Sequence, residues 1–230
     1  MATVKDSTSA KTRLNSLFGN IELLVAILLG VVSIGIAYAS FQAALYDSQM
    51  AGAYQEANNL STQAESFYLE SNQQFVQDTQ VWNRLTELTV EAKSGDSETA
   101  ASAQEKYDVL RFQAVSDEFA AAIDWSDAQN TADPEFYYSP LDNEDYQNFL
   151  FSSYSDTKEQ SDAVVVTGNA YNAYSDRLTL NTVLMSISLF LLGISAVLRQ
   201  RKIQLILISS GVGIFAVALI LTATIPYVSL

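Results

Sequence analysis

The segment from Asp133 to Asp145 concentrates side chains that can bind a ligand, with five acidic and three aromatic residues among thirteen. Hard cations such as Ca²⁺ take about six to eight oxygen ligands, and Asp142, Glu144 and Asp145 can supply several. However, the spacing lacks the alternating acids and central glycine of an EF-hand loop, and acidic residues are also typical of a helix N-terminus. We therefore predict no metal site here and keep these three acids only as weak candidates.

The aromatic residues of the same segment, Phe136, Tyr137 and Tyr138, have two possible roles. They can pack the loop against neighbouring helices, or they can line a ligand site. Because burying an aromatic ring stabilises a fold strongly, we predict that they hold the loop on the helices.

The composition removes most catalytic chemistry. The chain contains no cysteine and no histidine, so it has no thiolate and none of the usual groups that titrate near pH 7. The sequence shows no glycine-rich phosphate loop, no nucleophile elbow and no pair of metal ligands. We predict a non-enzymatic protein with no catalytic residue and no cofactor.

Glu22 is the one acidic side chain inside an apolar segment, and acids within membranes are often functional. It lies about one turn from the cytoplasmic end of its predicted span, where a helix N-terminus favours negative charge. Arg13, Arg199 and Arg201 are potential partners. We therefore predict a structural role for Glu22, with a proton or ion site as the alternative.

Charged and polar residues also mark the register of the predicted helices. Asp47 comes just after the first long apolar segment and Arg177 just before the second. We therefore expect the two side chains to face each other, although an exposed ion pair contributes only about 0–1 kcal/mol. Farther along, Ser71–Gln74 and Asp78–Gln80 interrupt an apolar stripe. Polar residues at core positions can specify register or line a wet cavity, but a solvated face is the more common interpretation.

Three apolar segments are long enough to cross a hydrocarbon core about 30 Å thick. They are residues 21–45, 178–198 and 203–228. The short connection between the last two predicts a tight antiparallel hairpin. Its turn holds three basic residues, Arg199, Arg201 and Lys202. Small residues four apart, such as Gly35 and Ala39, can pack these spans within one chain or between copies.

The distribution of charge predicts the orientation. Residues 47–177 hold 24 acidic and six basic side chains, a net charge of −18, whereas the rest of the chain carries +4. Because basic segments stay in the cytoplasm, we predict a multi-pass protein of the plasma membrane. Its cytoplasmic parts are a tail over residues 1–20 and a turn over 199–202, and residues 46–177 lie outside. A signal peptide cleaved near residues 37–39 is the alternative.

The extracytoplasmic region is predicted to be helical, so the predicted fold class is all-α. Its helices are expected to form an antiparallel bundle with coiled-coil character, and two of these helices continue directly into spans one and two. The first span continues as a helix to Lys93, because no proline occurs between Ile21 and that residue, and Ser94-Gly95-Asp96 then supplies a helix stop and a new N-cap. A second helix is expected from about Ser97 to Asn130 and a third from about Glu144 into the second span. Prolines prevent Thr131–Asn143 from being helical throughout. A break in the third helix between Asn148 and Tyr154 would give four helices instead of three.

The layout of one span, an acidic helical region and a two-span hairpin resembles that of three-span bacterial membrane proteins of unassigned function. The residues that carry this resemblance are Leu178–Val197 with the basic turn, and the aromatic and Gln/Ala-rich passage Ala39–Asn58. In size and helical outline the outer region is also similar to the four-helix sensor domains of chemoreceptors.

These observations lead to ranked expectations about function. We expect an accessory or scaffold protein whose acidic bundle mediates assembly or partner binding, with membrane lipid and a protein or a second copy as partners. A ligand-sensing bundle that signals through a partner is the first alternative, and a homo-oligomeric pore is the second. The acidic surplus argues against nucleic acid, because phosphate binding needs basic residues.

Overall fold

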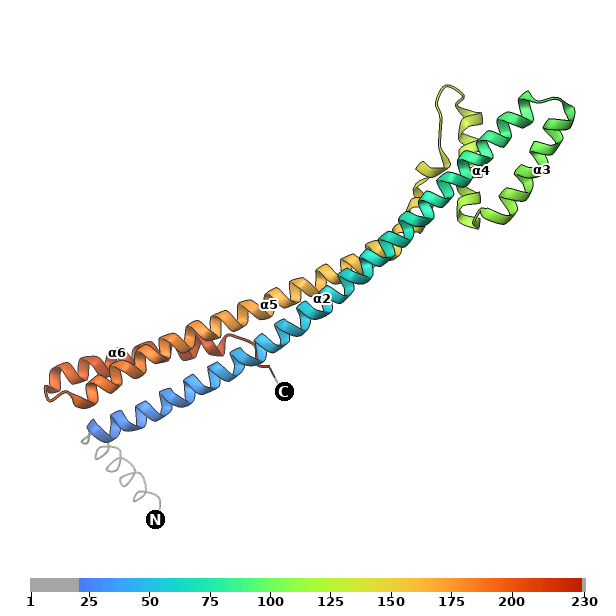
Figure 1. The fold of residues 1–230 in the computed structure, drawn as a ribbon. Helices are drawn as coiled ribbons and strands as arrows, with labels where there is room; N and C mark the ends of the chain where they lie inside the picture. Colours follow the sequence, from blue (N-terminus) through green and yellow to red (C-terminus); the bar gives the residue numbers. More distant parts are fainter. Residues whose placement is uncertain (1–20, 229–230) are drawn as a thin grey trace, which may run out of the picture. The chain divides into compact units, whose positions relative to one another are not determined.

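Residues 21–228 are described by a computed structural model, and within this range the chain is helical and contains no strand (Figure 1). The elements are α2 (Ile21–Ser94), α3 (Ser97–Ala114), α4 (Asp117–Ala132), the 3₁₀ turn η1 (Pro140–Asp142), α5 (Glu144–Val197) and α6 (Arg201–Ala223). The predicted all-α class is confirmed. The predicted tail over residues 1–20 lies outside the described residues.

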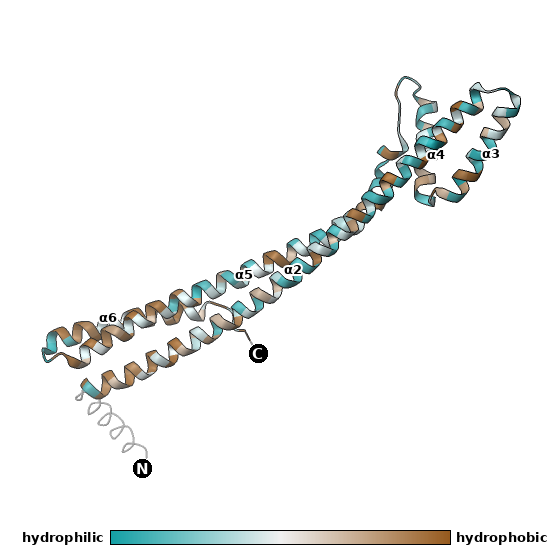
Figure 2. Ribbon diagram, in the orientation of Figure 1, coloured by the Kyte–Doolittle hydropathy of each residue, from teal (hydrophilic) through white to brown (hydrophobic). Residues whose placement is uncertain are grey.

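Three helices are long and apolar enough to cross a membrane, as the sequence predicted. They are α2, α5 and α6, and their apolar residues concentrate in the first part of α2, the last part of α5 and along α6 (Figure 2). By length and composition the chain is therefore consistent with a membrane protein.

The described chain divides into two compact units. Unit 1 comprises residues 21–54 and 165–228, and unit 2 comprises residues 55–164. Helices α2 and α5 contribute residues to both units.

The 74-residue helix α2 ends where the sequence supplies a stop signal. The backbone N–H of Gly95 donates to the carbonyl of Glu91 at 2.9 Å, and Asp96 then caps α3 by accepting the N–H of Thr99 at 2.9 Å. The predicted end at Lys93 is correct to within one residue.

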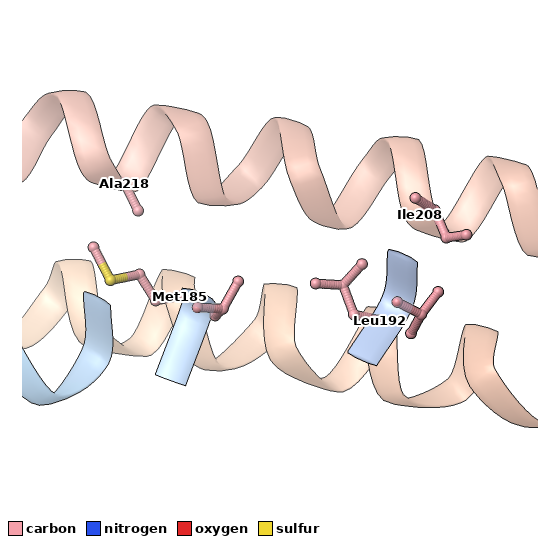
Figure 3. Close-up of a cluster of buried hydrophobic side chains, with 6 residues drawn as sticks. Met185, Leu192, Ile208 and Ala218 are labelled. Carbon is pink, nitrogen blue, oxygen red and sulfur yellow. The ribbon is translucent and has the colours of Figure 1, made fainter. Parts of the chain in front are cut away.

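Unit 1 has an apolar core to which α2, α5 and α6 all contribute. Met185 and Leu192 of α5 face Ala218 and Ile208 of α6 (Figure 3), and the α2 residues Val25 and Val32 complete the buried cluster. Polar contacts join α5 to α6 as well: the hydroxyl of Ser188 donates to the carbonyl of Gly211 at 2.7 Å, and the amide of Asn181 donates to the hydroxyl of Thr222 at 3.1 Å. Each such bond satisfies a buried polar group.

The third apolar helix is shorter than predicted. The sequence analysis extended it to Val228, but α6 ends at Ala223, because Pro226 lacks an N–H and disfavours helical geometry at Ile225. The chain that follows packs on α2. The side chain of Gln42 pairs with both backbone groups of Val228, at 3.1 and 3.3 Å, and the hydroxyl of Tyr46 donates to the carbonyl of Pro226 at 2.8 Å.

Unit 2 corrects the prediction of a single second helix. The expected helix from Ser97 to Asn130 is divided into α3 and α4 by an extended residue at Val115. Ser116 starts the new helix by accepting the N–H of Phe119 at 3.2 Å, and acidic residues follow it in the first turn. The alternative break at residues 148–154 is wrong, since α5 is continuous there.

The core of unit 2 forms where α2, α4 and α5 meet. Its fully buried members are Leu85, Phe119, Ala122, Ile123 and Tyr146. The rings of Phe119 and Tyr146 lie 5.0 Å apart. The division of the second helix allows Phe119, just after the break, to enter this core.

The polar residues in the middle of α2 are partly buried, which corrects the interpretation of a solvated face. The Ser71 hydroxyl donates to the carbonyl of Leu150 on α5. Asp78 is 1% exposed and accepts hydrogen bonds from the Tyr146 hydroxyl at 2.6 Å and the Gln74 amide at 3.0 Å. The bonds from Ser71 to Leu150 and from Tyr146 to Asp78 fix the register of α2 against α5, since a shifted register would leave buried polar groups unpaired.

Candidate functional site

The loop between α4 and η1 is held on α4 through the backbone of Tyr138. The N–H of Tyr138 donates to the side-chain oxygen of Asn130 at 2.8 Å. Its carbonyl accepts the Asn130 amide at 2.9 Å and the buried Ser126 hydroxyl at 2.6 Å. Three hydrogen bonds at one residue give this loop a defined position.

Aromatic rings gather around this anchor. Tyr138 lies edge-on to Trp125 at a centroid distance of 6.1 Å and to Phe136 at 5.0 Å, both favourable arrangements of aromatic pairs. Tyr138 thus packs the loop as predicted. However, Phe136 and Tyr137 stay 63% and 64% exposed, so packing leaves most of both residues in contact with solvent.

The acidic residues of the segment surround the start of α5. Asn143 caps the helix by accepting the N–H of Tyr146 at 2.9 Å. Glu144 and Asp145 occupy its first turn and Asp142 ends η1. Carboxylates at this position are stabilised by the unpaired N–H groups and the dipole of the helix, as the sequence analysis expected.

Together these residues enclose a cleft of about 420 Å³. Its lining consists of Trp125, Phe136, Tyr137, Tyr138 and the run Asp142–Asp145. Within residues 21–228 no three acidic side chains are arranged to hold a metal ion, so Asp142, Glu144 and Asp145 line one cleft without forming a ligand set. We call it the aromatic–acidic cleft.

Among residues 21–228, no basic side chain forms an ion pair with the acids of this cleft. Ion pairs in the described part of the chain join Arg84 to Glu87, Arg111 to Asp124 and Lys158 to Asp162. None of them includes a cleft residue, so the cleft combines carboxylates outside these ion pairs with exposed aromatic surface.

A second cleft, in unit 1, brings together the predicted membrane charges. It has a volume of about 530 Å³, and Glu22, Arg199, Arg201 and Gln204 are among its lining residues. Glu22 and the two arginines thus line the same cleft, but residues 21–228 contain no ion pair between them. Lys202 is exposed outside this lining, and Arg13 lies beyond the described range.

Asp47 and Arg177 are both exposed, and the ion pairs of the described residues do not join them. In this part of the molecule, tyrosine rings form the contact between α2 and α5 instead. The ring of Tyr46 lies 6.0 Å from Tyr171 and 5.1 Å from Tyr174. Burying aromatic rings stabilises more than an exposed ion pair does, which explains why the tyrosines set the contact.

Sequence reasoning missed two features of these sites. Trp125 of α4 was not connected with the loop, although it is eleven residues before Phe136. The buried pair of Asp78 and Tyr146 was not identified either. The signal was present, because Asp78 belongs to the polar residues that interrupt the apolar stripe of α2, but nothing along the chain identified a partner 68 residues away.

No protein-family model, no curated protein and no solved structure matches this chain.

Proposed function

We propose that this chain is a non-enzymatic integral membrane protein whose acidic, antiparallel helical bundle lies outside the cytoplasm and mediates assembly or partner binding. The three candidate spans support membrane insertion. The uneven charge of the chain, −18 over residues 47–177 against +4 elsewhere, supports the orientation.

The observation that carries a binding role is an apolar face on α3. Phe112 is 89% exposed, and Val109, one turn earlier, is 49% exposed. α3 lies outside the candidate spans, so lipid does not explain this exposure. Apolar side chains that neighbour each other on a solvated helix are typical of protein interfaces.

A photo-crosslinking amino acid at Phe112 tests this role. We expect one discrete crosslinked species in native membranes, at twice the chain mass for self-assembly or at another defined mass for a protein partner. The same amino acid at Gln104, an exposed position of α3 that is not one turn from Val109 or Phe112, is the matched control. A protein crosslinked equally at both positions, or at neither, would contradict the proposal.

A ligand-sensing bundle that signals through a partner is the second candidate, because the aromatic–acidic cleft gives unit 2 a place for a small molecule. A homo-oligomeric pore is the third. Mass measurement in detergent separates the pore from the other two, since a strict monomer eliminates it.

A further inference from the structure

The aromatic–acidic cleft has walls of two chemical kinds. Its aromatic lining residues, which we call the aromatic wall, are Trp125, Phe136, Tyr137 and Tyr138, and its acidic lining residues, the acidic wall, are Asp142, Glu144 and Asp145. Its volume of about 420 Å³ falls in the range typical of small-molecule sites, about 300–1,000 Å³.

Folding accounts for only part of this arrangement. Tyr138 anchors the loop, and Glu144 and Asp145 suit the start of α5. The exposure of Phe136 and Tyr137 contributes nothing to the core, because apolar rings gain stability only from the surface they remove from water. Two such rings beside carboxylates that no basic side chain of residues 21–228 pairs with indicate a ligand that both walls attract.

The chemistry of the two walls selects a cation. Aromatic faces attract cations through the ring quadrupole, and carboxylates attract them through charge. A hard metal ion is a poor fit, because it requires several oxygens converging on one point and the described residues form no such group. A weakly hydrated organic cation loses little on leaving water and can contact the rings directly.

We propose that the aromatic–acidic cleft binds a small organic cation of the quaternary ammonium class. Phe136 and Tyr137 contact the methylated ammonium group, and Asp142, Glu144 and Asp145 supply the opposing charge. This binding requires neither self-association nor a protein partner, so its failure would leave the proposed role of α3 untouched.

Calorimetric titration of the full-length protein with choline chloride tests the site. The protein is held in a maltoside detergent, since phosphocholine detergents would themselves offer the ligand. 3,3-Dimethylbutan-1-ol has the shape of choline without its charge and is the matched control ligand. We expect saturable binding of choline and none of the neutral alcohol, and sodium chloride at equal concentration corrects for ionic strength.

Phe136→Leu and Tyr137→Leu test the aromatic wall, and both positions are exposed enough to leave the fold intact. Each substitution should weaken choline binding by about threefold to tenfold. Asp142→Asn tests the acidic wall independently and should also weaken binding. Tyr227→Leu removes a similarly exposed ring from unit 1 and should leave the Kd unchanged. Thermal unfolding of each variant checks folding.

Three outcomes would overturn the proposal. They are the absence of saturable choline binding with a Kd below about 10 mM, equal binding of the neutral alcohol, and unchanged affinity in the Phe136→Leu and Tyr137→Leu variants. Saturable binding of calcium chloride without binding of choline would likewise reject the organic cation and favour a metal.

Discussion

At the scale of single residues, the most consequential contact in unit 2 is the hydrogen bond from Tyr146 to Asp78, 2.6 Å long and buried. Burial, followed by the hydrogen bond and negative charge of Asp78, raises the pKa of Tyr146 above its usual value. The folded state therefore favours the neutral Tyr146 phenol. Its hydroxyl can then donate the hydrogen bond that the buried Asp78 carboxylate needs.

This contact predicts a stability that depends on pH. Because the folded pKa of Tyr146 exceeds the unfolded one, the folded state holds its proton more tightly. The contribution is then complete below about pH 10 and falls as the pH rises above it. Tyr146→Phe should lower the free energy of unfolding by about 1–3 kcal/mol at neutral pH, since Asp78 loses its donor. It should also reduce the loss of stability at alkaline pH. Denaturation monitored by circular dichroism between neutral pH and pH 11 measures both effects.

Tyr138→Phe is the control for this prediction, because the Tyr138 hydroxyl makes only a long, exposed contact of 3.4 Å to Asp133. Water can replace that contact, so we expect almost no change at neutral pH. Equal effects of the two substitutions, or an unchanged alkaline slope in Tyr146→Phe, would contradict the assigned role of the Asp78 bond.

At the scale of elements, the glycines of α2 distinguish packed from free helix faces. A Cβ at Gly35 would lie 2.9 Å from Cε2 of Phe215 on α6, whereas a Cβ at Gly30 would meet nothing within 4 Å. The four-residue pair of Gly35 and Ala39 therefore includes residues that pack inside one chain, because Ala39 is also fully buried. Gly30 lies on an open face.

The same substitution at both glycines tests this difference. Gly35→Val should lower the melting temperature in detergent through overpacking against Phe215, at a cost of about 1–3 kcal/mol. Gly30→Val changes helix propensity by the same amount but meets open space, so it should be close to neutral. If Gly30→Val were the more damaging substitution, the packing of unit 1 would differ from the one described.

Helix α5 gives a second example of a glycine used for close approach. Gly168 is a weak helix former, yet α5 runs through it without a break. A Cβ there would lie 2.9 Å from the ring of Tyr54. The close contact with α2 offsets the lower helix propensity, so the glycine is a packing position and not a helix stop.

At the scale of the whole molecule, the proposed orientation can be tested directly because the chain has no native cysteine. A single cysteine at Ser102 in α3 should react with a membrane-impermeant maleimide in intact cells, since residues 46–177 are proposed to lie outside. A cysteine at Gln200, in the turn before α6, should react only after permeabilisation. Both positions are exposed. If the cysteine at position 200 reacted in intact cells and the one at position 102 were protected, the topology would be the reverse of the proposed one.

Much of the helical architecture was predictable from the sequence, for identifiable reasons. The absence of proline from Ile21 to Lys93 predicted one long helix, and Ser94-Gly95-Asp96 predicted its end. The division at Val115–Ser116 was missed because apolar residues recur at helical spacing on both sides of it, although Ser116 followed by two acids is a helix start signal. The early end of α6 was missed because the apolar run continues to Val228, and the helix-breaking effect of Pro226 within that run was not considered.

The sequence alone determined the helical class, the three apolar helices and the distribution of charge, because each depends on local periodicity, length or composition. Only the tertiary structure decided that Trp125 joins the Phe136–Tyr138 loop around the acids of α5, and that Asp78 meets Tyr146. These groups are brought together by packing between separate helices. Such contacts depend on how several side chains fit at once, and no spacing along one helix encodes them.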